Sequence, residues 1–416
     1  SDLRDLVRPS PEGSPARGVV EDVLREIWCD VLGTSPSACD AGFFGAGGDS
    51  ISATAVIARV NDKFDVALSP SALFACPRLE DLAARVADER GARAPAPLSP
   101  SQRGLWFLDR MGAGGAYTIC APLWLEGPLD VAALDRALEY VCARQGALRT
   151  VIERGEDGEP VQVVRGDVSV ALERVDLTGL PSAEREPEAH RLAAEARTRP
   201  FDLERGPLFR ATLLVLGDQR HALVLAMHHI VSDLWSMRVL HRDIRHAYAA
   251  CVQGRPAALP PLPVQYRDVA VRQVRDCEGE GFEQRLGFWT EGLRGAPSVT
   301  TLPPDRPVPA TPDLRAETVR FALGPDTVGA LRALGEAHAA TPFMALLAAF
   351  QVFLARASGG DDVVVGVPVA NRSRLEEEAL VGFFANTLAI RTRLGAEMSF
   401  VDVLAQVRET VVAGLA

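Results

Sequence analysis

A glycine-rich turn that ends in Asp-Ser constrains this sequence more than any other feature. Residues 43–51 read Phe-Phe-Gly-Ala-Gly-Gly-Asp-Ser-Ile, and apolar residues then recur at helical spacing as far as Phe64. This pattern predicts a loop that delivers Ser50 to the first turn of a helix. Gly47 and Gly48 allow positive φ and the close approach of a partner or a modifying enzyme. A phosphate ester on Ser50 would face the positive end of the helix dipole and its unpaired N–H groups.

Spacing alone leaves two interpretations of Asp49 and Ser50 open. The pair is consistent with an ordinary helix cap, because Asp and Ser are preferred at that position. It is equally consistent with a serine presented for modification. Two other phosphate or nucleophile motifs are excluded, because the turn is neither a Gly-x-Ser-x-Gly elbow nor followed by Gly-Lys-Ser/Thr.

The whole string and its flanking segments, residues 17–90, closely resemble the peptidyl carrier protein of nonribosomal peptide synthetases. The resemblance implies a four-helix bundle in which Ser50 carries 4′-phosphopantetheine as a phosphodiester, with Gly48, Asp49 and Ile51 completing the attachment site. It also implies a phosphopantetheinyl transferase as a partner. Periodicity places helices at residues 19–32, 50–64 and 79–90, with a short turn at 70–74.

Charge and cysteine usage exclude several other classes of protein. The net charge of −11 argues against nucleic-acid binding, which needs a basic face. The longest apolar run, residues 222–227, is too short to span a membrane, and no signal peptide is apparent. Without a Cys-x-x-Cys pair we expect no metal site and reduced thiols in the cytoplasm. The seven cysteines are Cys29, Cys39, Cys76, Cys120, Cys142, Cys251 and Cys277.

Two proline-containing stretches suggest domain boundaries. Residues 1–16 have the composition of a linker, and residues 91–97 predict a short, stiff linker. The remainder alternates helical and strand patterns, which predicts a layered α/β domain. The expected helices are residues 131–144, 184–199, 234–253 and 328–355, the last broken near Thr341-Pro342. The expected strands are residues 161–164, 168–172, 209–216, 221–227 and 363–367, the last buried on both faces. A proline-rich loop is expected at 255–263.

A second candidate site lies where the strand ending at Met227 gives way to a helix beginning at Leu234. The intervening residues include His228, His229 and Asp233. Adjacent strand residues point to opposite faces, so only one of the two histidines can face a given cavity. Asp233 can cap the following helix and orient an imidazole or bind an arginine. Two ordinary buried histidines, or a metal-binding His-His-x-x-x-Asp set, remain open on spacing alone.

The segment from Leu98 onward resembles the condensation domain of nonribosomal peptide synthetases. The resemblance rests on motifs that occur in the expected order, at residues 98–108, 147–150, 201–210, 227–233, 266–268, 365–372 and 381–388. It implies two lobes similar to chloramphenicol acetyltransferase, residues 98–266 and 267–416, that meet in a V. Among the subtypes of condensation domain, the sequence most resembles the one that accepts an L-configured donor.

The resemblance implies formation of a peptide bond between a donor thioester on Ser50 and the amine of an acceptor on a downstream carrier, with an adenylation domain upstream. His229 would serve as the base or as a positioning group, and His228 would have a structural task. Asp233 would pair with Arg372, and Trp235 and Asn386 would support the site. Neither a metal nor a nucleotide is implied.

Two departures from the family pattern keep alternatives open. Leu234 stands where the family has glycine, and the chain stops before the last family motifs, so we expect an incomplete second lobe. A leucine here would narrow a substrate channel or reduce activity. The alternatives are a gating or recruitment domain with little catalysis, an epimerase-type relative and an ester-forming relative.

Overall fold

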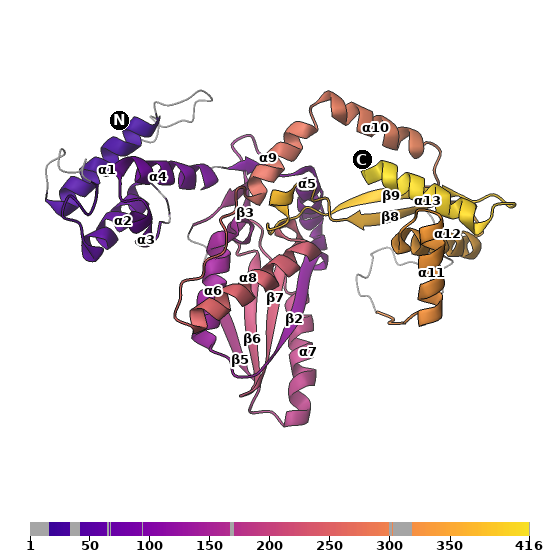
Figure 1. Ribbon diagram of the computed structural model, residues 1–416, viewed down its shortest axis with the longest axis horizontal. Coiled ribbons are helices and arrows are strands. Elements are labelled where there is room, and N and C mark those ends of the chain that lie inside the picture. The colour runs from indigo at the N-terminus through magenta and orange to yellow at the C-terminus, as the bar shows by residue number, and fades with distance from the viewer. Residues whose placement is uncertain are drawn as a thin grey trace.

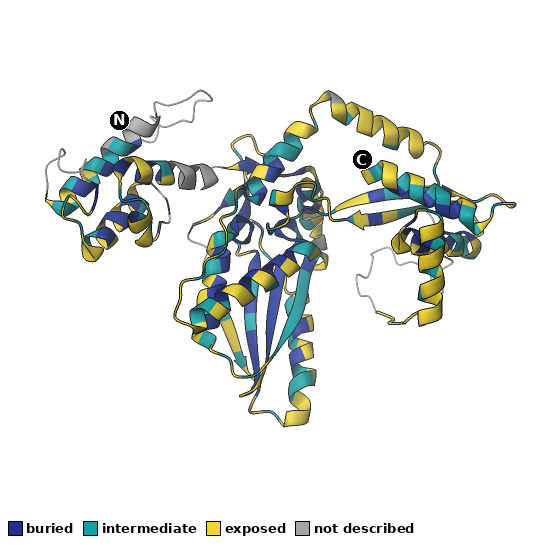
Figure 2. Ribbon diagram, in the orientation of Figure 1, coloured by how far each residue is buried: buried dark blue, intermediate teal, exposed yellow. Residues whose placement is uncertain are grey.

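The computed structural model describes residues 16–33, 42–64, 66, 68–93, 95–166, 170–298, 302 and 318–415. Most of the expected N-terminal linker, and Cys39, lie outside these residues. Figure 1 shows a small helical bundle at one end, a sheet-containing lobe in the centre and a second lobe that holds strands β8 and β9. In Figure 2 the buried residues concentrate inside each of these bodies.

The N-terminal bundle is held together by an apolar centre. Helices α1 (Ala16–Leu32) and α2 (Ser50–Phe64) pack around it, and α2 matches the predicted helix. Trp28 and Phe43 are fully buried there, with ring centroids 5.3 Å apart in a T-shaped contact. The aromatic pair that opens the glycine-rich turn therefore anchors the turn in the core through Phe43.

The predicted turn and linker at the end of the bundle are both partly wrong. Residues expected to form a turn form the short helix α3 (Ser71–Ala75). The last helix, α4 (Leu79–Arg93), runs three residues beyond its predicted end, and strand β1 (Ala96–Pro97) pairs with β4 (Pro160–Val164). Five of the seven residues expected to form the linker therefore lie in α4 or β1, and in β1 Pro97 pairs with Val161 of β4.

A four-stranded sheet in the order β2-β7-β6-β5 forms the centre of the first lobe. The antiparallel hairpin of β6 (Phe209–Gly217) and β7 (Arg220–His228) confirms the predicted strand pair. Strand β2 (Thr118–Glu126) pairs with β7 along its whole length and forms one edge of the sheet. Of the strand predicted at 168–172, residues 168 and 169 lie outside the described residues, residues 170 and 171 are not in a strand, and Leu172 begins β5 (Leu172–Asp176).

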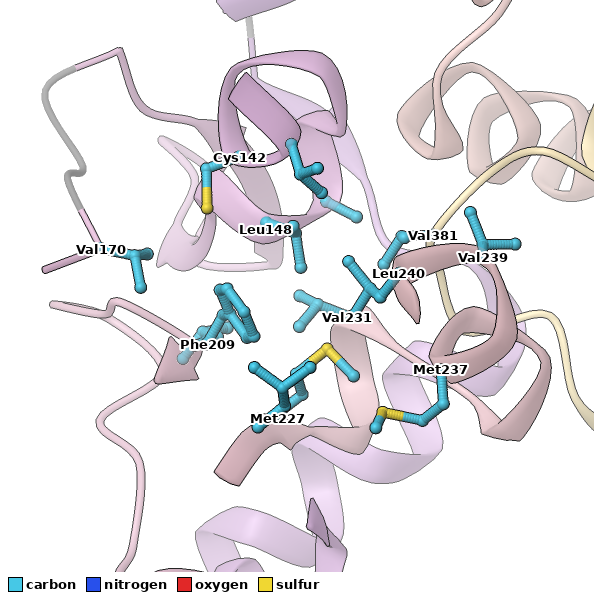
Figure 3. Packing of buried hydrophobic residues seen from close by; sticks show 14 of the residues in the cluster. Cys142, Leu148, Val170, Phe209, Met227, Val231, Met237, Val239, Leu240 and Val381 are labelled. Carbon is cyan, nitrogen blue, oxygen red and sulfur yellow. The ribbon is translucent and has the colours of Figure 1, made fainter. Parts of the chain in front are cut away.

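Helices cover both faces of this sheet. Helices α6 (Val131–Arg144) and α8 (Leu234–Val252) pack on one face, and α7 (Ser182–Thr198) packs on the other (Figure 1). All three correspond to predicted helices. Figure 3 shows the larger core, in which Phe209 and Met227 from the hairpin meet side chains from the helices.

The remaining elements of the first lobe frame the end of the sheet near His228. Strand β3 (Thr150–Arg154) completes the small sheet β1-β4-β3. Helix α5 (Pro100–Leu108) begins at a capping box formed by Ser99 and Gln102, and a π-helical turn, η2 (Asp109–Ala113), follows it. The short helices η3 (Gly114–Tyr117) and η4 (Gly146–Arg149) lead into β2 and β3.

The second lobe is built on a two-stranded antiparallel sheet, β8 (Asp362–Val369) and β9 (Asn386–Arg393). Helices α11 (Pro325–Ala337) and α12 (Pro342–Ser358) confirm the predicted break near Thr341, and α13 (Phe400–Leu415) completes the core. The prediction of a strand buried on both faces at 363–367 is wrong. Only Val363 and Val367 are buried, because a single sheet face is covered.

Two connections join the lobes. Helices α9 (Tyr266–Asp276) and α10 (Glu280–Gly292) lead from the first lobe to the second (Figure 1). In the other direction, residues 370–385 leave β8, pack in the first-lobe core and return to β9; we call them the crossover segment. Figure 3 shows Val381 of this segment next to Leu240 of α8. The predicted boundary at 266/267 therefore falls inside α9, whose Tyr266 and Val269 are buried in the core of the first lobe.

Among the described residues no single helix is both long and apolar enough to cross a membrane, and only the sharply bent pair α11 and α12 passes that test jointly.

Candidate functional sites

Ser50 stands exposed at the first position of α2. The capping task belongs to its neighbour: Asp49 Oδ1 accepts hydrogen bonds from the backbone N–H of Ile51 at 3.0 Å and of Ser52 at 2.8 Å. These hydrogen bonds, led by those from Ser52, lower the pKa of Asp49, so the cap is ionised at neutral pH. Because Asp49 satisfies the helix end, the Ser50 hydroxyl is left at the surface.

The surroundings of Ser50 fit a phosphodiester-linked prosthetic arm. Ser50 lies at a helix N-terminus, where backbone N–H groups favour an anion. A Cβ on Gly48 would lie 2.4 Å from the Phe43 ring, so only glycine lets the turn lie flat on the core. Ile51 is 82% exposed beside the serine and offers an apolar contact to a docking partner. The predicted attachment residues are thus brought together in one surface feature.

The two adjacent histidines occupy different environments. His228 ends β7 with no exposed surface, and its Nδ1 accepts the backbone N–H of Ile230 at 3.1 Å. Nε2 therefore carries the hydrogen and points toward Asp109 Oδ1, 3.7 Å away. Burial, aided by the proximity of His229, lowers the pKa of His228 to about 4, and burial raises the pKa of Asp109. His228 is a neutral, buried side chain.

His229 begins the short helix η5 (His229–Val231) and is only partly buried. Its Nδ1 lies 2.7 Å from the carbonyl oxygen of Ser232, which has only lone pairs to offer, so Nδ1–H donates. Nε2 is then the unprotonated nitrogen of the neutral ring. The Phe383 ring of the crossover segment packs edge-on against the imidazole, with centroids 4.9 Å apart. The Ser232 carbonyl of the loop and Phe383 of the crossover segment together fix the orientation of His229.

Asp233 joins the histidine loop to the crossover segment. It caps α8 by accepting the Ser236 N–H at 2.7 Å, and both carboxylate oxygens receive Arg372 Nη2, at 3.1 and 3.2 Å. The two side chains are 4% and 2% exposed. Oδ2 also accepts the Phe384 N–H at 3.2 Å. The structure thus brings Asp233 and Arg372 together as the sequence predicted, and their ion pair is desolvated.

Further hydrogen bonds fasten the same junction. The buried hydroxyl of Ser236 donates to Asp233 at 2.7 Å and lies 3.0 Å from the carbonyl oxygen and 3.1 Å from the N–H of Gly382. The predicted support residue Trp235 donates Nε1–H to the Glu378 carbonyl at 3.0 Å, and Arg372 lies over its ring. Two elements that are about 140 residues apart therefore share one polar network.

Three further residues of this network had no predicted role. Gln102 donates to the Ile230 carbonyl at 2.9 Å, and Tyr266 donates to the Phe383 carbonyl at 2.6 Å while contacting Ser99 at 3.1 Å. Tyr266 is buried, which raises its pKa. All three lie in stretches that matched family motifs, so the motifs marked the segments but not the contacts.

Two residues singled out in the sequence lie away from this network. Asn386 is exposed at the start of β9, and its side chain bonds only to the Thr387 N–H among the described residues. Leu234 is 78% exposed at the first position of α8, so its side chain points into solvent. Within the described part of the chain, no three His, Cys, Asp or Glu side chains gather as a metal site requires.

Comparison with known proteins defines the class of the chain. The family profile "Condensation domain" matches residues 93–415, and "Phosphopantetheine attachment site" matches residues 22–86. The chain belongs to the condensation-domain family, and it carries its own phosphopantetheine attachment domain. It is a carrier–condensation didomain of the nonribosomal peptide synthetase type, as the sequence motifs predicted.

Curated relatives support this classification. The chain is 40% identical over 409 residues to a linear gramicidin synthase of Brevibacillus parabrevis, covering 95% of this chain and 5% of the relative. It is 45% identical over 323 residues to phosphinothricin tripeptide synthetase PhsC of Streptomyces viridochromogenes, covering 77% and 30%. The chain therefore spans only a small part of the length of these relatives.

Solved structures confirm the predicted fold class. The first condensation domain of the calcium-dependent antibiotic synthetase, in complex with a substrate analogue, aligns with TM-score 0.66 and 27% identity, covering 77% of this chain and 75% of that chain. The X-domain of teicoplanin biosynthesis, in complex with OxyB, aligns with TM-score 0.68 and 31% identity, covering 77% and 70%.

Proposed function

We propose that this didomain transfers an acyl group from the arm on Ser50 to the α-amine of an aminoacyl acceptor on a downstream carrier. The residue whose carbonyl forms the thioester has the L configuration. The prosthetic arm supplies a flexible thiol that holds the acyl group as a thioester. The amine nitrogen bonds to the carbonyl carbon, the C–S bond breaks, and the thiol sulfur takes up a proton. The transfer lengthens the acceptor-bound product by the acyl group.

His229 is the side chain that we assign to the reacting amine. Because its Nδ1–H is held by the Ser232 carbonyl, Nε2 presents a lone pair that can hydrogen-bond the amine or accept its proton. This single observation carries the proposal, since a histidine in the other tautomer would present a donor. Phe383 on one side and the loop hydrogen bond on the other limit ring rotation, which favours positioning of the amine.

Asp233, Arg372 and Trp235 act through this loop and not on the substrate. Both charges of the ion pair are buried and hydrogen-bonded to the loop or the crossover segment, so neither is free to exchange protons with a bound amine. His228 likewise stays neutral and buried. We assign Asp233, Arg372, Trp235 and His228 the role of holding His229 in place.

The carrier half implies partners that act on Ser50. The exposed Ser50, flanked by Asp49 and Ile51, suits a phosphopantetheinyl transferase, and an upstream adenylation domain would load the arm. These partners and the free cysteines of the described residues are consistent with work in the cytoplasm.

The test is a single-turnover assay on this chain. Ser50 is loaded enzymatically with a peptidyl arm, an aminoacyl-pantetheine analogue is offered, and mass spectrometry follows the extended peptide. We expect His229→Ala to slow product formation by about 10²–10⁴-fold. His246→Ala, which removes an exposed histidine of helix α8, is the matched control and should leave the rate unchanged. Equal rates for both variants would remove His229 from the reaction.

A second pair of acceptors separates the two roles of His229. An acceptor whose amine has a low pKa is already neutral and needs little help from a base. If His229 accepts the proton, His229→Ala slows product formation less with this acceptor than with the ordinary one. If His229 positions the amine, His229→Ala slows product formation equally with both acceptors.

The X-domain likeness favours recruitment of another enzyme as a second candidate function. That domain is 31% identical to this chain, and its solved complex contains OxyB. Leu234, exposed at the start of α8, is consistent with an altered surface at this position. Loaded wild-type protein that yields no product with several acceptors would favour recruitment.

A further inference from the structure

Residues 96–99 lie between α4, the last helix of the carrier, and α5, the first helix of the condensation domain; we call them the tether. The first two form β1, which pairs with β4 at Gln162 and Val161. Three of the four residues are buried. The tether is therefore a packed part of the condensation domain, and it is the part that leads directly to the carrier.

Gln102 of α5 joins the tether to the histidine loop. Its side chain has no exposed surface, and both ends of its amide are used. Oε1 accepts the N–H of Ser99, the last residue of the tether, at 3.0 Å, and Nε2 donates to the Ile230 carbonyl at 2.9 Å. Because a backbone N–H can only donate and a carbonyl oxygen can only accept, the amide has one possible orientation. Its far end therefore holds η5, whose first residue is His229.

A second buried amide strengthens the link on the tether side. Gln162 of β4 is buried, and its Nε2 donates to the Pro97 carbonyl at 2.8 Å and to Gln102 Oε1 at 3.4 Å. The amide nitrogen carries two hydrogens, so both hydrogen bonds form at once. The tether is thus bonded to Gln102 twice, directly at Ser99 and through Gln162 at Pro97.

Another chain of hydrogen bonds runs from the tether to the ring that packs on His229. The Tyr266 hydroxyl donates to the Phe383 carbonyl at 2.6 Å and lies 3.1 Å from the Ser99 hydroxyl. Since the tyrosine hydrogen is used at Phe383, the serine hydroxyl donates to the tyrosine oxygen. The Phe383 ring packs edge-on against His229. The tether therefore reaches the imidazole by two routes, through the backbone of η5 and through Phe383.

Helix capping alone does not account for this arrangement. A capping box explains the hydrogen bond between Gln102 and Ser99, but not the bond from Gln102 to Ile230, which is 128 residues away. Nor does it explain the alignment of Gln162 with both the tether and Gln102. Buried amides are costly unless they are bonded, and a fully bonded network favours one arrangement of its members.

We propose that Gln102 is a positioning residue through which the tether sets the orientation of His229. When the carrier displaces the tether, the Gln102 amide follows, and its hydrogen bond to the Ile230 carbonyl tilts η5. The imidazole turns with this helix, because its Nδ1–H is held by the Ser232 carbonyl of the same loop. The place of the carrier and the direction of His229 Nε2 are thereby coupled.

The effect of this coupling on transfer rests on the proposed function, in which His229 Nε2 meets the reacting amine. Misplacement of reacting groups by about 1 Å can cost about 100-fold in rate. A small tilt of η5 is therefore sufficient to separate a productive from an unproductive position of the carrier. The orientation of the ring itself can be measured without any reaction, which keeps the two inferences separable.

The test follows the NMR signal of the His229 Cε1–H group in the whole chain, made with isotope-labelled histidine. Its absence in His229→Ala assigns the signal, and the neighbouring Phe383 ring makes it sensitive to the angle between the two rings. Gln102→Met keeps the length of the side chain but loses both hydrogen bonds. We expect it to shift the His229 signal and to slow single-turnover product formation about 10-fold or more.

Gln351→Met is the matched control. Gln351 also has no exposed surface, and its amide also joins two groups, the Ile390 carbonyl at 2.9 Å and the Thr392 hydroxyl at 2.7 Å. It belongs to α12 of the second lobe, so its replacement should lower stability and leave the His229 signal in place.

Gln162→Met tests the tether side of the link. It removes the hydrogen bond to Pro97 and leaves the bond from Gln102 to Ile230. We expect a smaller shift of the His229 signal in the same direction. Combined with Gln102→Met it should add nothing, because both changes act through Gln102. If Gln102→Met does not fold, the shift in Gln162→Met alone decides the question.

Three results would overturn the proposal. One is a His229 signal that stays in place in Gln102→Met or in Gln162→Met, and another is an equal shift in Gln351→Met. The third is additive shifts from Gln102→Met and Gln162→Met, because the tether would then not act through Gln102. If His229→Ala reacts as fast as the wild type, the proposed function fails, whereas a selective shift in Gln102→Met still supports positioning of the ring.

Discussion

Replacing Asp233 with alanine is expected to destabilise the first lobe strongly while leaving the carrier bundle intact. Within the described residues, its carboxylate is the only one that forms an ion pair with the Arg372 guanidinium, whose side chain is 2% exposed. Removing it leaves a buried cation without compensation. The same change removes the cap of α8 and the acceptor of the Phe384 N–H.

The magnitude follows from these separate losses. Breaking one side of a buried ion pair costs about 3–5 kcal/mol, and loss of an N-cap costs about 1 kcal/mol. Because Ser236 bonds both groups, the terms overlap and do not add fully. We therefore expect Asp233→Ala to lower the free energy of unfolding by about 3–5 kcal/mol, less than the full sum of the two terms. Asp233→Asn, which keeps an acceptor for the cap, should lose less.

The assay is urea unfolding followed by tryptophan fluorescence in a Trp28→Phe background. Trp28 is the only tryptophan of the carrier, so the remaining four report the condensation domain. Free energy falls linearly with urea, and the midpoint gives the change. The double variant Asp233→Ala/Arg372→Met, which removes both charges but keeps apolar volume, should recover about 2 kcal/mol relative to the sum of the single changes.

The reasoning fails if Asp233→Ala costs less than about 1 kcal/mol, a value typical of an exposed ion pair. It also fails if the double variant equals the sum of the single changes, because the two side chains would then be energetically independent. Either result would show that the ion pair with Arg372 does not hold the loop in place.

Three further predictions concern other buried contacts. Burial keeps His228 neutral in the folded state, so its contribution to the free energy of unfolding is complete above pH 6.5 and is lost as the pH falls toward its folded pKa of about 4. In urea unfolding, the free energy of unfolding of the wild type should fall by roughly 2–3 kcal/mol more than that of His228→Gln between about pH 7 and about pH 4.5. Equal falls in the two proteins would contradict a buried neutral ring. Gly382→Ala places a Cβ 2.1 Å from the Tyr266 ring and should cost about 1–3 kcal/mol in the same assay; an unchanged midpoint would mean that the ring moves freely. Gly48→Ala drives a Cβ into the Phe43 ring and should slow the mass increase that a phosphopantetheinyl transferase produces on the carrier, whereas an unchanged rate would show that the turn tolerates a side chain.

The sequence predicted those elements whose signal is local. The β6/β7 hairpin and helices α2, α6 and α8 have strong periodicity and clear turn or cap residues, and the structure confirms them. The strand expected at 168–172 was wrong at residues 170 and 171, because two valines in a short run do not fix where a strand begins. The strand at 363–367 was wrong in its burial, because its valines lie on a sheet covered on one face only.

The candidate site was predictable in its residues and not in its connections. The sequence predicted different environments for the two histidines, and they differ, but strand alternation is not the reason, because β7 ends at His228 and His229 begins η5. The hydrogen bonds of Gln102 and Tyr266, however, join residues that are more than 100 positions apart, and no local pattern encodes such partners. Asn386 matched a motif, yet it is exposed at the start of β9 and lies outside the network.

The crossover segment has a mechanical consequence. It leaves β8 and returns to β9, yet Leu380, Val381 and Phe384 are embedded in the first lobe. If the two lobes rock against each other, bending must be absorbed at the two ends of this segment, near Asn371, whose φ is +49°, and near Asn386. The axis of such a motion would pass close to Phe383 and therefore close to His229. Rocking would widen or narrow the approaches for the two carriers while the imidazole itself stays still.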